Sequence, residues 1–138
     1  MKGKWFSVVA LVAVAAGLLS QPSCGRSQKL VSITVNPPSV SITQNPGQQV
    51  QTQFTALGSY IHPPETRDLT NIAVWAVDTP QFIAVVPNQP GLIETTGNGC
   101  GNNLGVTASV YTDDNNPSGN IVVGSATVSI TFSSGTCP

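Results

Sequence analysis

Charge is scarce in this chain of 138 residues, because only 8% of the residues are Asp, Glu, Lys or Arg. After Cys24 only three basic residues remain, against six acidic ones. Binding to nucleic acid needs clustered Lys and Arg, which displace counterions from the phosphates. The composition therefore argues against a nucleic-acid partner, and Ser, Thr, Asn and Gln must supply most of the polar surface.

Histidine is almost absent, since His62 is the only copy. A histidine metal cluster needs several copies, and a Ser-His-Asp triad needs a nucleophile within reach of its histidine. His62 lies in the Pro-rich segment 61–68, with no obvious nucleophile beside it. We interpret it as a solvated loop residue, and we expect no catalytic residue, no metal site and no cofactor.

Acidic residues cluster at one place only, where Asp113 and Asp114 precede Asn115 and Asn116. Ca²⁺ takes about six to eight oxygen ligands, and this run lacks the glycine and the bidentate glutamate of an EF-hand loop. We interpret it as a turn held by Asx hydrogen bonds, and calcium binding stays open as the alternative.

Long apolar runs are also lacking, apart from residues 8–19, which follow Lys2 and Lys4. A basic start followed by an apolar run too short for a hydrocarbon core of roughly 30 Å is typical of an export signal. We predict such a signal over residues 1–23, with an uncleaved membrane anchor as the alternative. The rest of the chain is poor in Glu, Lys and Leu, so we expect no helix there.

Cysteine is rare and odd in number: Cys24, Cys100 and Cys137. An exported protein with three cysteines leaves one of them unpaired within its own chain. Cys24 lies before the folded region, and it follows the apolar run closely, as the lipid-accepting cysteine of a bacterial lipoprotein does. We therefore predict lipidation of Cys24 and a disulfide between Cys100 and Cys137. A Cys24 bridge to another cysteine, or a free Cys24 thiol, remains open.

The residues around Cys24 agree with a lipoprotein signal only in part. Ser23 and Gly25 fit, whereas Gln21 and Pro22 depart from the usual pattern. Cleavage near Ser20 by an ordinary signal peptidase, which would give a secreted or periplasmic protein, stays the alternative.

Alternating apolar and polar residues after the tether, residues 24–29, predict β-strands. The proline pair at 37–38 interrupts the first strand, and we expect the chain to pass from one sheet to another there. We expect loops over residues 61–68 and 112–124. The inward-facing sets predicted for the strands are Val31, Ile33 and Val35; Val50, Thr52, Phe54 and Ala56; Ala73, Trp75 and Val77; Leu104, Val106, Ala108 and Val110; and Ala126, Val128, Ile130 and Phe132.

Trp75 is the expected centre of this arrangement. A single large indole can fill the space between two sheets that lie roughly 10 Å apart. We predict that Trp75 is the core anchor on a central strand and that Phe54 meets it there.

Five spaced motifs lie between Leu30 and about Thr96: Val31-Ser32-Ile33-Thr34-Val35, Gln53-Phe54-Thr55-Ala56 with Gly58 and Tyr60, Asp68-Leu69-Thr70, Val74-Trp75 and Ile83-Ala84-Val85. In this order and spacing they resemble the bacterial Ig-like group 2 family. The resemblance implies an all-β fold, an Ig-like β-sandwich of about seven antiparallel strands over residues 30–138. The segment 97–103, which contains Cys100, departs from the family pattern.

The resemblance implies a non-enzymatic module at the bacterial cell envelope, with an adhesive or structural role and a membrane anchor at Cys24. The alternatives are a secreted or periplasmic module that binds a glycan or small ligand, and a hydrolase without a recognisable motif. With Trp75 assigned to the core, Tyr60 and Tyr111 are the aromatic residues left for a sugar. We favour strand-edge packing for both.

Overall fold

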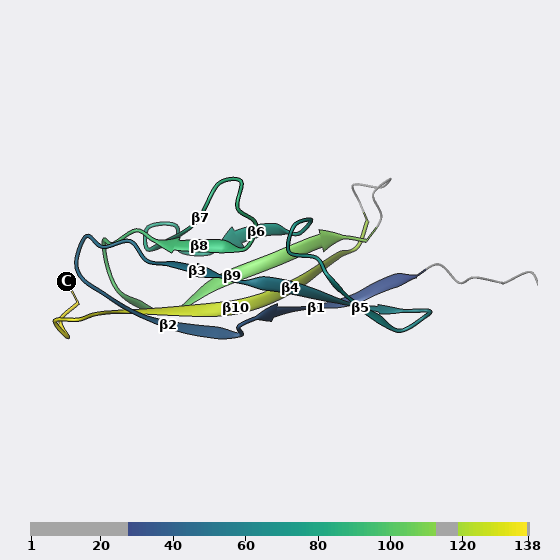
Figure 1. The fold of residues 1–138 in the computed structure, drawn as a ribbon, viewed down its shortest axis with the longest axis horizontal. Helices are drawn as coiled ribbons and strands as arrows, with labels where there is room; N and C mark the ends of the chain where they lie inside the picture. The colour runs from purple at the N-terminus through teal and green to yellow at the C-terminus, as the bar shows by residue number, and fades with distance from the viewer. Residues whose placement is uncertain (1–27, 113–118, 138) are drawn as a thin grey trace, which may run out of the picture.

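The computed structural model describes residues 28–112 and 119–137, and all regular structure in them is β. Within these two ranges no helix capable of crossing a membrane is found. Figure 1 shows the strands, whose bounds are β1 (Lys29–Asn36), β2 (Ser39–Gln44), β3 (Gln51–Gln53), β4 (Thr55–Ile61), β5 (Glu65–Asp68), β6 (Val74–Val77), β7 (Ile83–Val85), β8 (Leu92–Thr95), β9 (Gly101–Tyr111) and β10 (Ile121–Phe132).

The strands form three sheets, ordered β1-β4-β5, β2-β10-β9-β6 and β3-β8-β7. Neighbouring strands are antiparallel except β2 and β10, which are parallel. The result is a sandwich-like all-β fold. One core unites the three sheets, and its fully buried side chains include Val35, Phe54, Ile83, Ile93, Val106, Val128 and Ile130.

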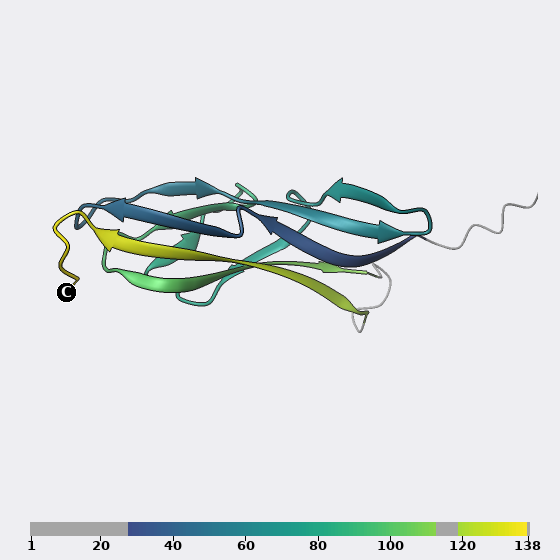
Figure 2. The same ribbon diagram turned by 90° about the horizontal axis from the view of Figure 1, so that it is seen from below.

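The body is elongated, and the described chain starts at one end and finishes at the other (Figures 1 and 2). We call the first the N-terminal end; it holds Gln28, the β4–β5 turn and the adjoining tips of β9 and β10. We call the other the disulfide end; it holds Cys100, Cys137 and the end of β2.

The predicted sheet switch at the proline pair is confirmed. β1 pairs with β4 in one sheet, and β2 pairs with β10 in another. A second switch lies at Phe54, where we expected one uninterrupted strand. There β3 pairs with β8 whereas β4 pairs with β1, and the Phe54 N–H donates to the carbonyl oxygen of Gly91 at 2.8 Å. Ten strands, of which β9 and β10 are the longest, replace the predicted number of about seven.

The inward-facing sets are confirmed for the two longest strands, since Leu104, Val106 and Ala108 of β9 are buried. The prediction for Val31 is wrong, because that side chain is 45% exposed while Leu30 is buried. The register of β1 against β4 shifts between Leu30 and Ser32. Such an irregularity adds a residue to one strand and resets the alternation.

Two predicted loops are shorter than expected. The segment 61–68 contains β5, which pairs with β4 and has all four residues exposed. The loop predicted over 112–124 ends before Ile121, because β10 begins there and Ile121 pairs with Tyr111 of β9. β5 has every residue exposed, and the start of β10 reads Ile-Val-Val-Gly without alternation of apolar and polar residues, so neither could be recognised from the periodicity of the sequence.

Candidate functional site

The prediction that Trp75 is the buried anchor of a central strand is wrong. Trp75 lies on β6, which is an edge strand of its sheet, and its side chain is only partly buried against the core. An edge strand has a neighbour on one side only, so its large side chains remain open to solvent on the other. Phe54 is fully buried, as predicted, and it fills the interior where Trp75 was expected.

The indole of Trp75 is held by hydrogen bonds that reach back to β4. Its Nε1–H donates to the carbonyl oxygen of Thr70 at 3.0 Å. The Thr70 hydroxyl accepts from the Ala56 N–H at 2.9 Å, and the Thr70 N–H donates to Asp68 Oδ1 at 2.8 Å. Hydrogen bonds from the Thr70 hydroxyl and amide lower the pKa of Asp68, so the carboxylate stays ionised. The indole N–H is therefore bonded to a backbone carbonyl of a residue that is itself held by Ala56 and Asp68.

A shallow pocket of about 180 Å³ opens beside this ring. Its other wall is the loop between β7 and β8, which protrudes next to β6 in Figure 1. Three backbone hydrogen bonds shape the loop: Val86 N–H to Leu92, Gln89 N–H to Val86, and Leu92 N–H to Gln89. The lining residues are Ala73, Trp75, Val85, Val86, Pro87, Asn88, Gln89 and Pro90, and none of them is charged.

A second candidate surface lies on the outside of the β6, β9 and β10 strands, at the N-terminal end. Val74 pairs with Ser109, Ser109 pairs with Val123, and Tyr111 pairs with Ile121. Residues paired directly across antiparallel strands project to the same face. The resulting apolar row has side chains that are 47% to 58% exposed, and it consists of Val74, Tyr111, Ile121 and Val123.

The N-terminal end also holds a polar cluster on β5. Glu65 Oε2 accepts from Arg67 at 2.7 Å and from Gln28 Nε2 at 2.8 Å. These two hydrogen bonds, with that of Arg67 the larger influence, lower the pKa of Glu65 to about 2. The Arg67 guanidinium lies 5.0 Å from the centre of the Tyr60 ring. Tyr60 thus contacts a cation, while Tyr111 belongs to the apolar row, so the two tyrosines form no common site.

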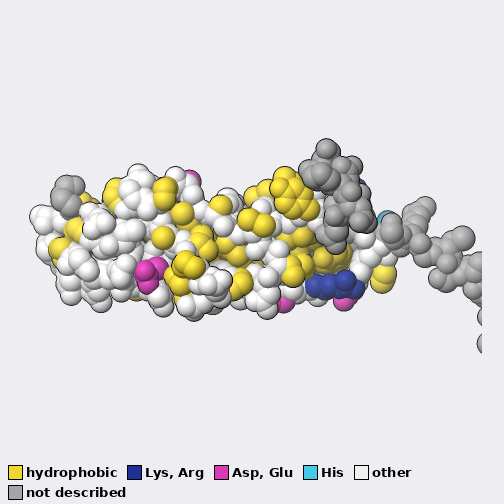
Figure 3. Space-filling view, turned by 90° about the horizontal axis from the view of Figure 1, so that it is seen from above, with side chains coloured by type: hydrophobic (Ala, Val, Ile, Leu, Met, Phe, Trp, Pro, Cys, Tyr) yellow, Lys and Arg dark blue, Asp and Glu magenta, His cyan; other side chains and the backbone are white. Residues whose placement is uncertain are grey.

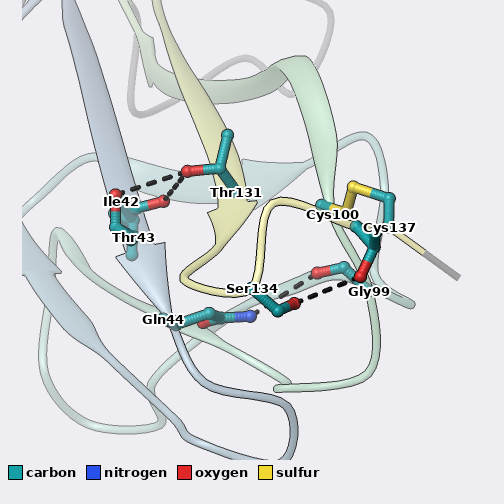
Figure 4. The surroundings of a disulfide bond; sticks show 9 residues. Ile42, Thr43, Gln44, Gly99, Cys100, Thr131, Ser134 and Cys137 are labelled. Carbon is teal, nitrogen blue, oxygen red and sulfur yellow. Dashed lines mark hydrogen bonds between the residues drawn. A yellow bond between two sulfur atoms is a disulfide. The ribbon is translucent and has the colours of Figure 1, made fainter.

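The disulfide end is built around the bridge between Cys100 and Cys137, whose Cα atoms are 5.9 Å apart (Figure 4). The predicted pairing is present in the structure. Beside it Gln44 and Thr95 are buried, and the Thr95 hydroxyl donates to Gln44 Oε1. The same hydroxyl accepts from the Val50 N–H at 2.9 Å. Covalent and buried polar links therefore meet at this end.

The remaining predicted site residues do not assemble into a centre. His62 is exposed in the β4–β5 turn, with a φ of 63°. Cys24, the run Asp113 to Asn116 and the predicted export signal lie outside the described residues. Residues 28–112 and 119–137 contain no group of three or more His, Cys, Asp or Glu side chains arranged to hold a metal ion.

Neither a protein-family model nor any curated protein matches this chain. The resemblance to bacterial Ig-like group 2 domains stays a prediction from the sequence motifs.

Proposed function

We propose that the protein is a non-enzymatic Ig-like module that a lipid on Cys24 holds at the bacterial cell envelope, in a structural or interaction role. The finer fold assignment belongs to this proposal. It is supported by the division of the first strand between two sheets at the proline pair and by the long antiparallel pair of β9 and β10, both of which suit an Ig-like sandwich.

The observation that carries the proposal is the position of the apolar row. The row includes Tyr111 and Ile121 at the adjoining tips of β9 and β10, toward the end of the body at which β1 starts (Figure 1), and only residues 25–27 separate Gln28 from Cys24. Four extended residue steps span at most about 14 Å. A lipid on Cys24 would therefore hold the N-terminal end at the membrane surface, with the row close to the headgroups.

A clustered set of exposed aliphatic and aromatic side chains marks an interaction surface. Val and Ile favour the acyl boundary of a bilayer, and Tyr favours the headgroup level. The row is suited to rest against the anchoring membrane, so the module would lie at a fixed tilt and present its disulfide end outward.

Cys24→Ser in the full chain tests the anchor. Wild type is expected in the detergent phase after phase separation, with the mass of several acyl chains on its N-terminal residue. Cys24→Ser is expected in the aqueous phase. The double variant Cys100→Ser and Cys137→Ser is the matched control: it also loses cysteines, but it should partition as wild type does. Wild type without acyl mass would refute the anchor.

The contribution of the apolar row is tested on full chains that carry Cys24→Ser. We expect weak sedimentation with phospholipid vesicles, lowered several-fold by Val74→Ser with Val123→Ser. Val31→Ser is the matched control, because Val31 is 45% exposed but lies outside the row. The membrane contact of the row would be refuted if Val31→Ser lowered sedimentation as much as the double variant, or if the double variant sedimented as its parent does. Neither result would affect the proposed lipid anchor.

A further inference from the structure

The pocket between Trp75 and the β7–β8 loop is independent of the anchor and of the apolar row. We propose that it binds one pyranose ring of a neutral saccharide. The proposal goes beyond the envelope role, and it gives Trp75 a function that burial in a core would not.

The aromatic wall is suited to a sugar because the only polar atom of the indole is already engaged. The Nε1–H of Trp75 donates to Thr70, which leaves an apolar ring surface toward the pocket. A pyranose has one face of C–H groups that packs on such a surface. Because the indole N–H is bonded to the Thr70 carbonyl oxygen, and Thr70 is in turn bonded to Asp68, binding would require little reordering of the side chain.

The opposite wall supplies hydrogen bonds to the ring hydroxyls. Asn88 and Gln89 are exposed at the pocket, and each amide offers both donors and an acceptor. Asn88 has a φ of 60°, and Pro87 and Pro90 flank the two amides. The loop thus presents the amides from a backbone with few alternative conformations.

The absence of charge among the lining residues selects the class of ligand. An anionic sugar would need a cationic partner, and an aromatic cation site would use a carboxylate or several rings. The pocket has one ring and two amides. Figure 3 shows the face on which β6, β7 and β8 lie in Figure 1, and few charged side chains appear on it.

The volume of the pocket is suited to one pyranose ring. The volume of about 180 Å³ is below the roughly 300–1,000 Å³ of pockets that enclose drug-sized ligands. The pocket is open, so neighbouring residues of an oligosaccharide would continue outside it. Affinity should accordingly be modest, with a dissociation constant on the order of 0.1–1 mM.

The chain provides its own reporter, because Trp75 and Trp5 are its only tryptophans. The full chain with Trp5→Phe is titrated with cellotetraose, with chitotetraose, with a glucuronic-acid oligomer and with choline, and tryptophan emission is recorded. We expect a saturable change with at least one of the two neutral oligosaccharides, and none with the glucuronic-acid oligomer or choline.

Asn88→Ala and Gln89→Ala should each weaken that binding about five-fold, which corresponds to the loss of one hydrogen bond. Gln49→Ala is the matched control, since Gln49 is exposed but does not line the pocket. Unchanged melting temperatures of the three variants would separate lost binding from lost folding. Saturation by choline alone, no response to either neutral oligosaccharide, or equal affinity in all three variants would overturn the proposal.

Discussion

The two ends of this elongated body are held together by different means. At the disulfide end, a covalent bridge and a buried hydrogen-bond network join segments that are distant in sequence. Cys100 is bonded to Cys137, and the Thr95 hydroxyl links Gln44 to Val50. At the N-terminal end, the corresponding links are the exposed hydrogen bonds of Glu65 with Arg67 and Gln28.

Close packing at the disulfide end also involves a glycine. Gly97 has a φ of +77°, and its carbonyl oxygen accepts from the Gly47 N–H at 3.0 Å. A Cβ on Gly97 would lie 2.9 Å from the carbonyl carbon of Gly47. A side chain at this position would therefore collide with the β2–β3 turn.

The difference between the ends predicts where the structure opens first. Exposed ion pairs contribute little to stability because solvent screens them, whereas a buried polar network resists opening because its groups would lose their partners. We expect faster amide exchange in β5 and the start of β1 than in β8 and the end of β10. Stability would thus be highest far from the proposed anchor.

Removing the disulfide should change the difference in stability between the two ends more than any other substitution. The two cysteines are separated by 37 residues, and closing a loop of that length constrains the unfolded chain by about 4 kcal/mol in the chain-entropy model. The double variant Cys100→Ser and Cys137→Ser should lose about that much unfolding free energy in urea melts. Amide exchange should accelerate most at the disulfide end. A loss below about 1 kcal/mol would show that the bridge does not determine the difference.

Thr95→Val should lower the free energy of unfolding by a smaller amount, through a change at the same end. The substitution preserves shape but leaves the Gln44 oxygen and the Val50 N–H without their partner. Leaving a buried polar group unsatisfied costs about 1–3 kcal/mol. Thr43→Val is the control, because Thr43 forms its side-chain hydrogen bond with Thr131 at the surface. Equal urea midpoints for the two variants would contradict a stabilising role for the buried network.

The sequence predicted side-chain direction better than strand arrangement. Alternation identified the buried faces of β9 and β10 because both strands are long and regular. It failed at Val31, where the register shift at the start of β1 reverses the faces. It also missed β5, because an edge strand with every residue exposed shows no alternation.

The candidate sites depended on strand order, which periodicity does not encode. The pattern placed Trp75 on the inner face, but it could not reveal that β6 is an edge strand. The pocket forms because residues 86–90 lie beside Trp75 although they are not its neighbours in the sequence. The apolar row likewise requires β6, β9 and β10 to be neighbours. The disulfide was predictable because counting cysteines needs no geometry.

The smallest expected change in stability is the one caused by substituting Glu65 at the N-terminal end. Its pKa lies at about 2, below the ordinary value of 4.5, because Arg67 and Gln28 donate to the carboxylate. A carboxyl whose pKa is lower in the folded state stabilises the fold above the unfolded pKa. That contribution is lost as the pH falls from about 4.5 toward 2. Glu65→Gln should therefore flatten the pH dependence of stability in this window, because the variant lacks at neutral pH the contribution that wild type loses on acidification.

The measurement pairs a carboxyl NMR titration of Glu65 with urea melts of wild type and Glu65→Gln between pH 2 and pH 7. The difference between the two stability curves isolates Glu65 from Asp68 and Asp78, whose pKa values are also lowered. Glu94→Gln is the matched control, since Glu94 accepts from Gln51 but lies outside the cluster. A Glu65 titration near its ordinary value would show that the hydrogen bonds from Arg67 and Gln28 to the carboxylate do not persist in solution. The N-terminal end would then lack the polar link between Gln28 and β5, while the covalent bridge at the disulfide end remains.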